Sequence, residues 1–438
     1  MKVVILASGK GERIRERCLS PKPLISLLGV SLIERVILTA KEAGFEDFLI
    51  VVGYEREKIK ERLKDGKSYG IKIAYVDNDD WEKENGMSLF KAAPFLKEKF
   101  ILLMSDHIFD KEILELLKES EGEDCILCID KNPPHYIDLE DATKVKLDNN
   151  YIKNIGKNLK DYDALDTGIF LLSPVVFDIL KKSIEKGDST LSGAIKILAQ
   201  EKEIEGLDIK GRFWIDIDTE KELNTAQNIL LKKLTKTTDG VISRYLNRPI
   251  SRRITKILLN YLFFTPNKVS FISFLIATLS AIIFSLGNYI SFFIGGTLAQ
   301  ISSILDGCDG EIAKCKFKVS EYGAWFDACL DRYADAFIIL GISFGLWKVS
   351  FDIKIWIVSF SALIGSFMNS YTAIKYDAVF TKEKKSPKIR IGRDLRYFLI
   401  MLGAILNKLF SALVILSFIT NFESIRRVFV LKEKEAEK

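Results

Sequence analysis

Histidine and cysteine are scarce in this chain, with only 2 and 6 of them among 438 residues. Cys125 and Cys128 lie in an apolar run that is typical of a buried strand, and neither a second Cys-x2-Cys pair nor a histidine cluster accompanies them. Structural zinc sites and a disulfide framework are therefore excluded, and we expect the cysteines to be reduced. The apolar stretch at the N-terminus is too short for a signal peptide.

Glutamine is also rare, since only Gln200, Gln227 and Gln300 occur, whereas lysine and glutamate are abundant. This bias is associated with hyperthermophiles, although AT-rich genomes also favour lysine. The composition is therefore only a weak indication of a heat-adapted source.

The net charge of +5 is modest, and the placement of the basic residues is more informative than their excess. They cluster between Arg244 and Lys256 and again between Lys382 and Arg396, next to apolar segments. Loops held on the cytoplasmic side of a membrane show this pattern. Nucleic-acid binding is the competing interpretation, but the membrane-flanking position disfavours it, so we expect no nucleic-acid partner.

The two halves of the chain differ in kind. Residues 1–235 alternate charged helical stretches with short apolar strands, which predicts a Rossmann-like three-layer α/β domain. Residues 236–266 mix apolar and basic positions and are expected to form a linker with an amphipathic helix on the cytoplasmic leaflet. Long apolar runs dominate residues 267–430, which predicts an all-α integral membrane domain.

The number of membrane crossings is less clear than their presence. Four are predicted first, at about 267–286, 289–305, 322–346 and 353–375. Residues 393–429 form either one crossing with a tail or two compact crossings broken at Asn407 and Lys408. Because basic residues near the C-terminus favour a cytosolic end, we predict six crossings.

Aspartates occur at four positions of the membrane half, where burial of a carboxylate is unfavourable unless it faces a polar cavity or a cation. Asp306 and Asp309 share one helix face, and Asp327 and Asp331 share another. Two facing pairs of carboxylates predict a site for Mg²⁺ or Mn²⁺. Asp335 adds a fifth acid on the Asp331 face, and we expect it to support the others. A solvated loop that is acidic by chance is the alternative.

The pattern Asp-x2-Asp-Gly-x2-Ala-Lys-x8-Gly-x3-Asp-x3-Asp that begins at Asp306 resembles the signature of the CDP-alcohol phosphotransferases. Members of that family are membrane enzymes that transfer a phosphate-linked group from a CDP-alcohol to a second alcohol and release CMP. The resemblance implies that the first three aspartates bind metal and that Asp331 serves as a ligand or as the base. It also agrees with six crossings and with a homodimer. The implied nucleotide contacts are Gly310, Ala313, Lys314 and Gly323, with Lys314 standing where the family has arginine.

The N-terminal half opens with a strand that ends at Ala7 and continues into a glycine loop with Gly9 and Gly11. Glycines there let backbone N–H groups approach phosphate oxygens. Lys22 lies between two prolines that fix its backbone. Together with Arg13, these residues resemble the nucleotidyltransferases that make nucleoside-diphosphate sugars from a sugar phosphate and an NTP. The resemblance implies nucleotide contacts at Ala7, Gly9, Gly11 and Lys22. For Lys22 alone, a solvated loop lysine would be the ordinary interpretation.

Later segments resemble the same family in order, although a strand-end cap or a turn is the alternative for any single aspartate. Asp106 ends an apolar strand, where open α/β sheets place ligands, and matches the first metal aspartate. Asp216 is our choice for the second metal ligand, with Asp218 as a close rival. The resemblance further implies base, ribose and sugar contacts at Asn85, Gly86, Ser88, Asp166 and Gly168.

This chemistry requires positioning and charge neutralisation. A sugar phosphate is already a nucleophile, so no general base is needed for its in-line attack on the NTP α-phosphorus. Magnesium, Arg13 and Lys22 can stabilise the charge that develops.

A nucleotidyltransferase fused to a consumer of CDP-alcohols resembles the bifunctional family that makes CDP-inositol from CTP and inositol 1-phosphate. Those enzymes then transfer the phosphoinositol group to a second inositol 1-phosphate, giving di-myo-inositol phosphate phosphate, an osmolyte precursor. The resemblance implies a multi-pass protein of the cell membrane with both sites facing the cytoplasm. A lipid alcohol acceptor is the alternative, and a cation transporter with a nucleotide sensor is another.

The acceptor's phosphate has a candidate partner in the basic stretch that includes Arg393, with Lys388, Arg390 and Arg396. The competing interpretation is that this charge only keeps the loop on the cytoplasmic side.

Overall fold

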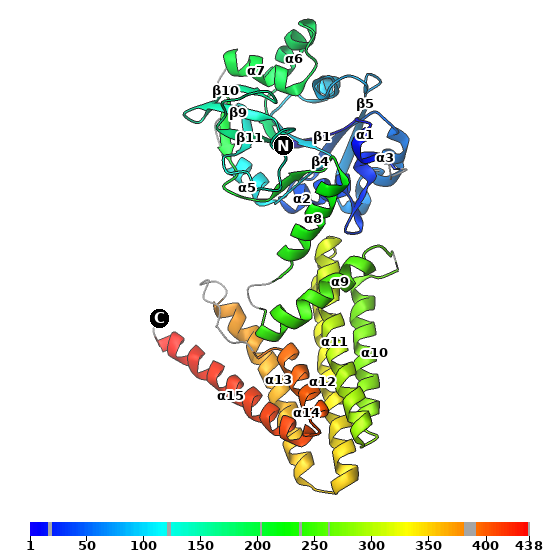
Figure 1. Cartoon of the computed structure of the whole chain (residues 1–438). Helices are drawn as coiled ribbons and strands as arrows, with labels where there is room; N and C mark the ends of the chain where they lie inside the picture. Colours follow the sequence, from blue (N-terminus) through cyan, green and yellow to red (C-terminus); the bar gives the residue numbers. More distant parts are fainter. Residues whose placement is uncertain are drawn as a thin grey trace. The chain divides into compact units, whose positions relative to one another are not determined.

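A computed structural model describes residues 1–15, 20–120, 124–201, 204–235, 239–261, 263–380 and 391–436. The chain divides into two compact units, Met1–Ile229 and Leu230–Lys438 (Figure 1). The first is coloured from blue to green and the second from green to red in Figure 1.

The first unit is built on a nine-stranded sheet of order β5-β4-β1-β6-β11-β8-β12-β10-β9. β1 pairs in parallel with β4 and β6, and β11 pairs antiparallel with β6 and β8. The strands are β1 (Lys2–Ala7), β4 (Asp47–Val52), β5 (Lys72–Asp77), β6 (Phe100–Met104), β8 (Ile126–Asp130), β9 (Lys144–Asp148), β10 (Tyr151–Gly156), β11 (Ala164–Leu172) and β12 (Glu205–Asp208).

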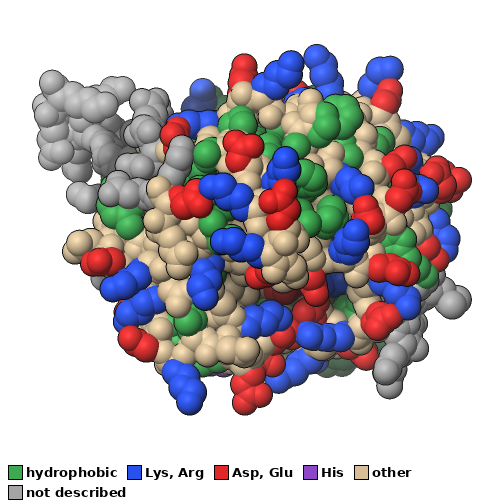
Figure 2. Space-filling view, turned by 90° about the horizontal axis from the view of Figure 1, so that it is seen from above, with side chains coloured by type: hydrophobic (Ala, Val, Ile, Leu, Met, Phe, Trp, Pro, Cys, Tyr) green, Lys and Arg blue, Asp and Glu red, His purple; other side chains and the backbone are tan. Residues whose placement is uncertain are grey.

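Nearly every residue of β1, β4 and β6 is buried, which is what a parallel sheet covered by helices on both faces requires. The longer helices of this unit are α2 (Leu32–Glu42), α3 (Arg56–Leu63), α4 (Asn85–Lys91), α5 (Glu112–Glu119), α6 (Val175–Glu185), α7 (Leu191–Glu201) and α8 (Glu220–Lys233). The predicted Rossmann-like α/β fold is confirmed. On the face shown in Figure 2, acidic and basic side chains are interspersed.

A small two-stranded sheet lies beside the carboxyl end of β6. Its strands are β7 (His107–Phe109) and β13 (Trp214–Asp216), which pair antiparallel so that Asp216 lies opposite His107. Because β6 ends two residues before Asp106, this pairing brings groups more than one hundred residues apart to the same edge.

The second unit consists of helices, and the predicted all-α membrane domain is confirmed. Among the described residues, five helices are long and apolar enough to cross a membrane: α10 (Pro266–Phe284), α11 (Tyr289–Cys315), α12 (Glu321–Ser350), α13 (Lys354–Phe380) and α15 (Leu409–Ala436). Before them come the π-helix η4 (Ser243–Asn247) and α9 (Arg248–Leu258).

The predicted count of six crossings is not confirmed, because α14 (Arg393–Ile405) has only 13 residues. A helix of that length spans about 20 Å, whereas the hydrocarbon core of a bilayer is about 30 Å thick. Asn407 adopts a left-handed backbone conformation at φ 54° and separates α14 from α15. The break therefore falls where the sequence places it, but the helix before it is short.

Two glycines of α12 allow this helix to approach α10 closely. A Cβ on Gly341 would clash with the carbonyl oxygen of Ala281, and one on Gly345 with that of Phe284. The spacing of four residues is that of the small-xxx-small motifs at helix interfaces in membranes. Figure 1 shows α10, α11 and α12 side by side.

Gly341→Val is expected to destabilise the membrane unit by about 1–3 kcal/mol, because the added methyl groups force the two backbones apart. The measurement is the melting temperature of the detergent-solubilised protein, followed by scanning fluorimetry. Leu340→Val is the control, since Leu340 is 54% exposed on the same helix. Equal melting of the two variants would contradict the close packing of α10 and α12.

Candidate active sites

The first unit contains a cavity of about 480 Å³ at the carboxyl ends of its central strands. Predicted residues that line it are Gly9, Gly11, Lys22, Asn85, Ser88, Asp106, Asp166, Gly168, Asp216 and Asp218. The glycine loop, the predicted base-binding segment and the predicted metal ligands thus face one space. Arg13, Ala7 and Gly86 are predicted residues that do not line it. Ala7 is buried in β1, and Gly86 packs against Ser189, whose carbonyl oxygen would lie 2.6 Å from an added Cβ.

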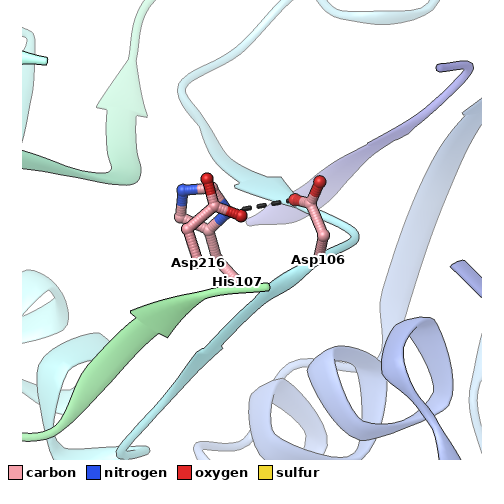
Figure 3. Close-up of side chains that lie close together, drawn as sticks. All are labelled: Asp106, His107 and Asp216. Atoms are coloured by element: carbon pink, nitrogen blue, oxygen red, sulfur yellow. Dashed lines mark hydrogen bonds and ion pairs between the residues drawn. The ribbon is translucent and has the colours of Figure 1, made fainter. Parts of the chain in front are cut away.

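Three side chains at one end of this cavity point toward one another (Figure 3). His107 Nδ1 lies 3.0 Å from Asp106 Oδ1 and 3.6 Å from Asp216 Oδ1, and each residue offers one ligand atom within 4.8 Å of the others. Asp216 Oδ1 is buried without a hydrogen-bond partner among the described residues. Two carboxylates and an imidazole at these distances fit a divalent cation.

His107 was not predicted from the sequence. The only signal for it was its position next to Asp106 at the end of a strand. Burial alone would lower the pKa of His107, but the carboxylates of Asp216 and Asp106 raise it to about 9. A metal ligand must be deprotonated, so a cation at this site competes with the His107 proton.

Lys22 neutralises the carboxylates in this structure. Its Nζ lies 2.5 Å from both Asp106 Oδ2 and Asp218 Oδ1 and 3.9 Å from Asp216 Oδ1. Burial by itself would lower the pKa of Lys22, yet the three aspartates hold it above its ordinary value. Burial likewise opposes ionisation of Asp106, but Lys22 and His107 keep the pKa of Asp106 low. Burial raises the pKa of Asp216 to about 6.

The geometry separates the two rival aspartates that the sequence left open. Asp216 lies in the cluster with Asp106 and His107, whereas Asp218 faces Lys22 and Arg13, whose Nη1 is 3.3 Å away. The backbone N–H of Asp218 donates to Glu222 Oε2 at the start of α8. Asp216 is therefore the better-placed candidate ligand.

Two glycines in the cavity are required by close approaches. Gly11 has φ 65°, and an added Cβ would lie 2.5 Å from Lys22 Cβ. Gly168 has φ 73°, and an added Cβ would lie 2.6 Å from His107 Cδ2. The backbone N–H of Gly168 donates to Asp166 Oδ1 at 2.7 Å. Both positions favour glycine for conformation as well as for space.

Other polar groups of the cavity region were missed by the sequence analysis. Asp141 lines the cavity, pairs with Arg13 Nη1 and accepts from Lys157 Nζ at 2.7 Å. The hydrogen bonds from Arg13 and Lys157 lower the pKa of Asp141 to about 2. The Arg13 side chain itself is 60% exposed. Neither Asp141 nor Lys157 belongs to a motif with a recognisable spacing.

The second unit contains a comparable cluster. Asp306 and Asp309 on α11 and Asp327 on α12 each offer a carboxylate oxygen within 4.8 Å of the others. Ser270 Oγ donates to Asp309 Oδ2. Asp327 Oδ1 is buried and has no hydrogen-bond partner among the described residues. Three carboxylates with one unsatisfied oxygen fit Mg²⁺ or Mn²⁺.

Asp331 lies outside this three-carboxylate group. Its Oδ1 accepts from Arg393 Nη1, which is also 2.6 Å from Asp306 Oδ1. Arg393 is therefore paired with carboxylates in this structure and not isolated as a phosphate ligand. Arg396 is buried and forms an ion pair with Asp335 at 3.0 Å, whereas Lys388 and Arg390 lie outside the described residues.

The predicted nucleotide contacts of the second unit lie along the C-terminal turns of α11 and the first turn of α12. Gly310 is exposed, and an added Cβ would have no atom within 4 Å. Lys314 is exposed, Ala313 is half-buried, and the N–H of Gly323 donates to Ser320 Oγ. A cavity of about 260 Å³ adjoins the carboxylates and is lined by Asp239, Gly240, Ser243, Asn247, Arg248, Ser251, Ser303, Asp306, Gly307, Gly392, Arg393 and Asp394.

Two family models match segments of this chain, one in each half. The family model for the MobA-like NTP transferase domain matches residues 3–149, and that for the CDP-alcohol phosphatidyltransferases matches residues 263–422. A solved structure described as the inositol-1-phosphate CTP transferase from T. maritima is 27% identical, covers 51% of this chain and 92% of its own, and superposes with a TM-score of 0.48.

Full-length relatives are found as well. Proteins named bifunctional IPC transferase and DIPP synthase are 36% identical in Aquifex aeolicus, over 99% of this chain and 98% of the relative, and 36% identical in Rubrobacter xylanophilus, over 98% and 96%. The relative of that name in Archaeoglobus fulgidus is 35% identical over 93% of this chain and 79% of its own length. This chain therefore belongs to the family of bifunctional IPC transferases and DIPP synthases.

Proposed function

We propose that this enzyme first makes CDP-inositol from CTP and inositol 1-phosphate, releasing pyrophosphate. It then transfers the phosphoinositol group to a second inositol 1-phosphate, giving di-myo-inositol phosphate phosphate and CMP. The observation that supports the proposal is that the described part of each compact unit contains a cluster of side chains that could hold a metal ion, next to a cavity. The names of the full-length relatives supply the substrates.

In the first reaction, Asp106, His107 and Asp216 would hold Mg²⁺, which neutralises charge on the triphosphate. Lys22 lies at the same end of the cavity and contacts the phosphate at which substitution occurs. Arg13 lies at the cavity's edge and adds a second positive charge. Gly9 and Gly11 leave the backbone N–H groups of the loop open to phosphate oxygens. These residues position the substrates and neutralise the charge on the triphosphate, and inositol 1-phosphate brings its own nucleophilic oxygen.

In the second reaction, Asp306, Asp309 and Asp327 would hold Mg²⁺ or Mn²⁺, which neutralises the diphosphate of CDP-inositol. Asp331 accepts the proton of the attacking inositol hydroxyl. Arg393 binds the acceptor's phosphate in the 260 Å³ cavity. Since Arg393 also contacts Asp331, a phosphate bound there holds the ring hydroxyls near the base.

The two alternatives from the sequence are less well supported. A lipid alcohol acceptor is not favoured, because the relatives that match the whole chain are named DIPP synthases. Because this chain belongs to a family of transferases, we do not favour a cation transporter with a nucleotide sensor. We further propose that the protein is a homodimer in the cell membrane and that both active sites face the cytoplasm, as the basic residues beside the apolar segments indicate.

Removing one cluster should abolish one reaction and spare the other. Asp106→Asn is expected to lower pyrophosphate release at least about 100-fold, because loss of a metal ligand should reduce activity at least as much as loss of a group that only orients a ligand. CMP release from supplied CDP-inositol should persist. Asp327→Asn should give the reverse pattern, so that each variant is the control of the other. Loss of both reactions in either variant would contradict two independent sites.

The role of Asp331 can be tested separately. Asp331→Asn keeps the shape of the side chain but cannot accept the proton, so CMP release should fall about 100-fold or more while pyrophosphate release is unchanged. Stopped assays with CDP-inositol and inositol 1-phosphate measure this rate. If CMP release continues near the wild-type rate, another group is the base.

The substrates are tested by an inventory of products. Detergent-solubilised enzyme given CTP, Mg²⁺ and labelled inositol 1-phosphate should convert the label into a water-soluble phosphodiester, identified by mass spectrometry. Each NTP is tested separately, and CTP should be preferred. Label that appears only in an organic extract containing lipid would contradict the proposed acceptor.

A further inference from the structure

The amphipathic helix α9 was expected only to lie on the membrane surface, but one of its faces packs against α11. Three side chains on that face donate to Glu311, which is 1% exposed. Arg248 Nη1 donates at 2.9 Å, Ser251 Oγ at 2.7 Å and Thr255 Oγ1 at 2.7 Å. Their spacing of three and four residues places them on one stripe of α9. Glu311 is thus a buried carboxylate held by α9.

Contacts with α9 and η4 follow one stripe of α11 over three turns. Gln300 Nε2 donates to Asn247 Oδ1 at 2.8 Å, and Asn247 Nδ2 donates to Ser303 Oγ at 3.2 Å. Arg248 Nη1 also donates to the carbonyl oxygen of Gly307, 3.3 Å away. With Glu311, these positions recur every three or four residues, so α9 and η4 contact a single face of α11 at four successive positions.

Asp309, one of the candidate metal ligands, lies on the other side of the same helix. Asp309 and Glu311 are two positions apart, which is a rotation of roughly 200° about the helix axis. Glu311 therefore does not join Asp309 in binding a cation. A buried charged pair contributes little net stability compared with apolar packing. The contact between Arg248 and Glu311 therefore serves to fix the orientation of α11 and not to stabilise the fold.

Small rotations of α11 matter for a metal site. A helix with its side chains has a radius of about 5–6 Å, so a rotation of about 20° moves a carboxylate by roughly 2 Å. Metal–oxygen distances tolerate only about 0.2 Å. Asp306 and Asp309 must also meet Asp327, which belongs to a different helix. The cluster therefore depends on a feature that holds α11 in one rotational setting.

We infer that Arg248 and Glu311 are positioning residues for the second reaction. Arg248 is anchored on the other side by Asp239, 3.0 Å from its Nε, and its charge balances that of Glu311. Together they set the rotation of α11 so that Asp306 and Asp309 face Asp327. This inference rests on the proposed function of the membrane unit.

The test uses the full-length enzyme in lipid nanodiscs with the variants Glu311→Gln and Arg248→Gln. Arg253→Gln is the matched control, since Arg253 is exposed on the same helix. CMP release from CDP-inositol gives kcat and KM, and pyrophosphate release reports on the other site. Mn²⁺ binding, followed by electron paramagnetic resonance in an Asp106→Asn, Asp216→Asn background, reports on the membrane cluster alone.

Both charge-removing variants should lower kcat for CMP release about 10–100-fold and weaken Mn²⁺ binding by a similar factor. Pyrophosphate release should stay within about twofold of wild type, because the cluster proposed for the first reaction lies in the other compact unit. Arg248→Lys, which keeps the charge, should restore part of the loss. The Arg253→Gln control should match wild type throughout.

Wild-type Mn²⁺ binding and CMP release in the charge-removing variants would overturn the inference. If these variants do not fold, Ser251→Ala decides, because it removes one hydrogen bond and no charge. Weaker Mn²⁺ binding with slower CMP release in Ser251→Ala supports the positioning role, and unchanged values overturn it. A wild-type enzyme that releases no CMP would contradict the proposed function itself, which is a separate result.

Discussion

Carboxylates held within a few ångströms of one another repel unless a cation lies between them. Both candidate sites of this chain contain such carboxylates, so each needs a cation. In the first unit, Lys22 lies between Asp106 and Asp218. In the second, Arg393 lies between Asp306 and Asp331. One basic side chain thus stabilises each cluster.

These cations also explain how the clusters take up highly charged substrates. Lys22 and Arg393 each line the cavity next to their own cluster, where a phosphate group would bind. In the proposed reactions, the carboxylates would hold the metal ion and the basic side chain would bind the phosphate. Each carboxylate that holds the metal would then keep a cation beside it, so the exchange of partners avoids the large penalty of an isolated ion at these carboxylates.

The sequence was sufficient to predict the features that depend on the spacing of nearby residues. Intervals of three and four residues place Asp306 with Asp309 on a helix, and the cost of a carboxylate among apolar segments indicates its purpose. The strand ending before Asp106 predicted the edge at which the first cavity lies. The order of strands and helices was sufficient for the fold class.

Other features depend on contacts that spacing does not encode. The ion pair of Arg248 with Glu311 joins residues on separate helices, and His107 gains its significance only when β13 brings Asp216 beside it. Gly86 matched a nucleotide-binding segment, and the structure shows that it also packs against Ser189. Tertiary contacts, not local pattern, decide these features. The count of six crossings was not confirmed, because α14 has only 13 residues, although the break at Asn407 falls where the sequence places it.

The most direct test of the account is a crystal structure of the protein with Mn²⁺, CTP and CDP-inositol, measured at the manganese absorption edge. The account predicts one anomalous peak between Asp106 and Asp216 and another among Asp306, Asp309 and Asp327, with Lys22 and Arg393 turned toward phosphate oxygens. Bound nucleotides with no manganese at either cluster, and with both basic side chains still paired to the aspartates, would contradict it.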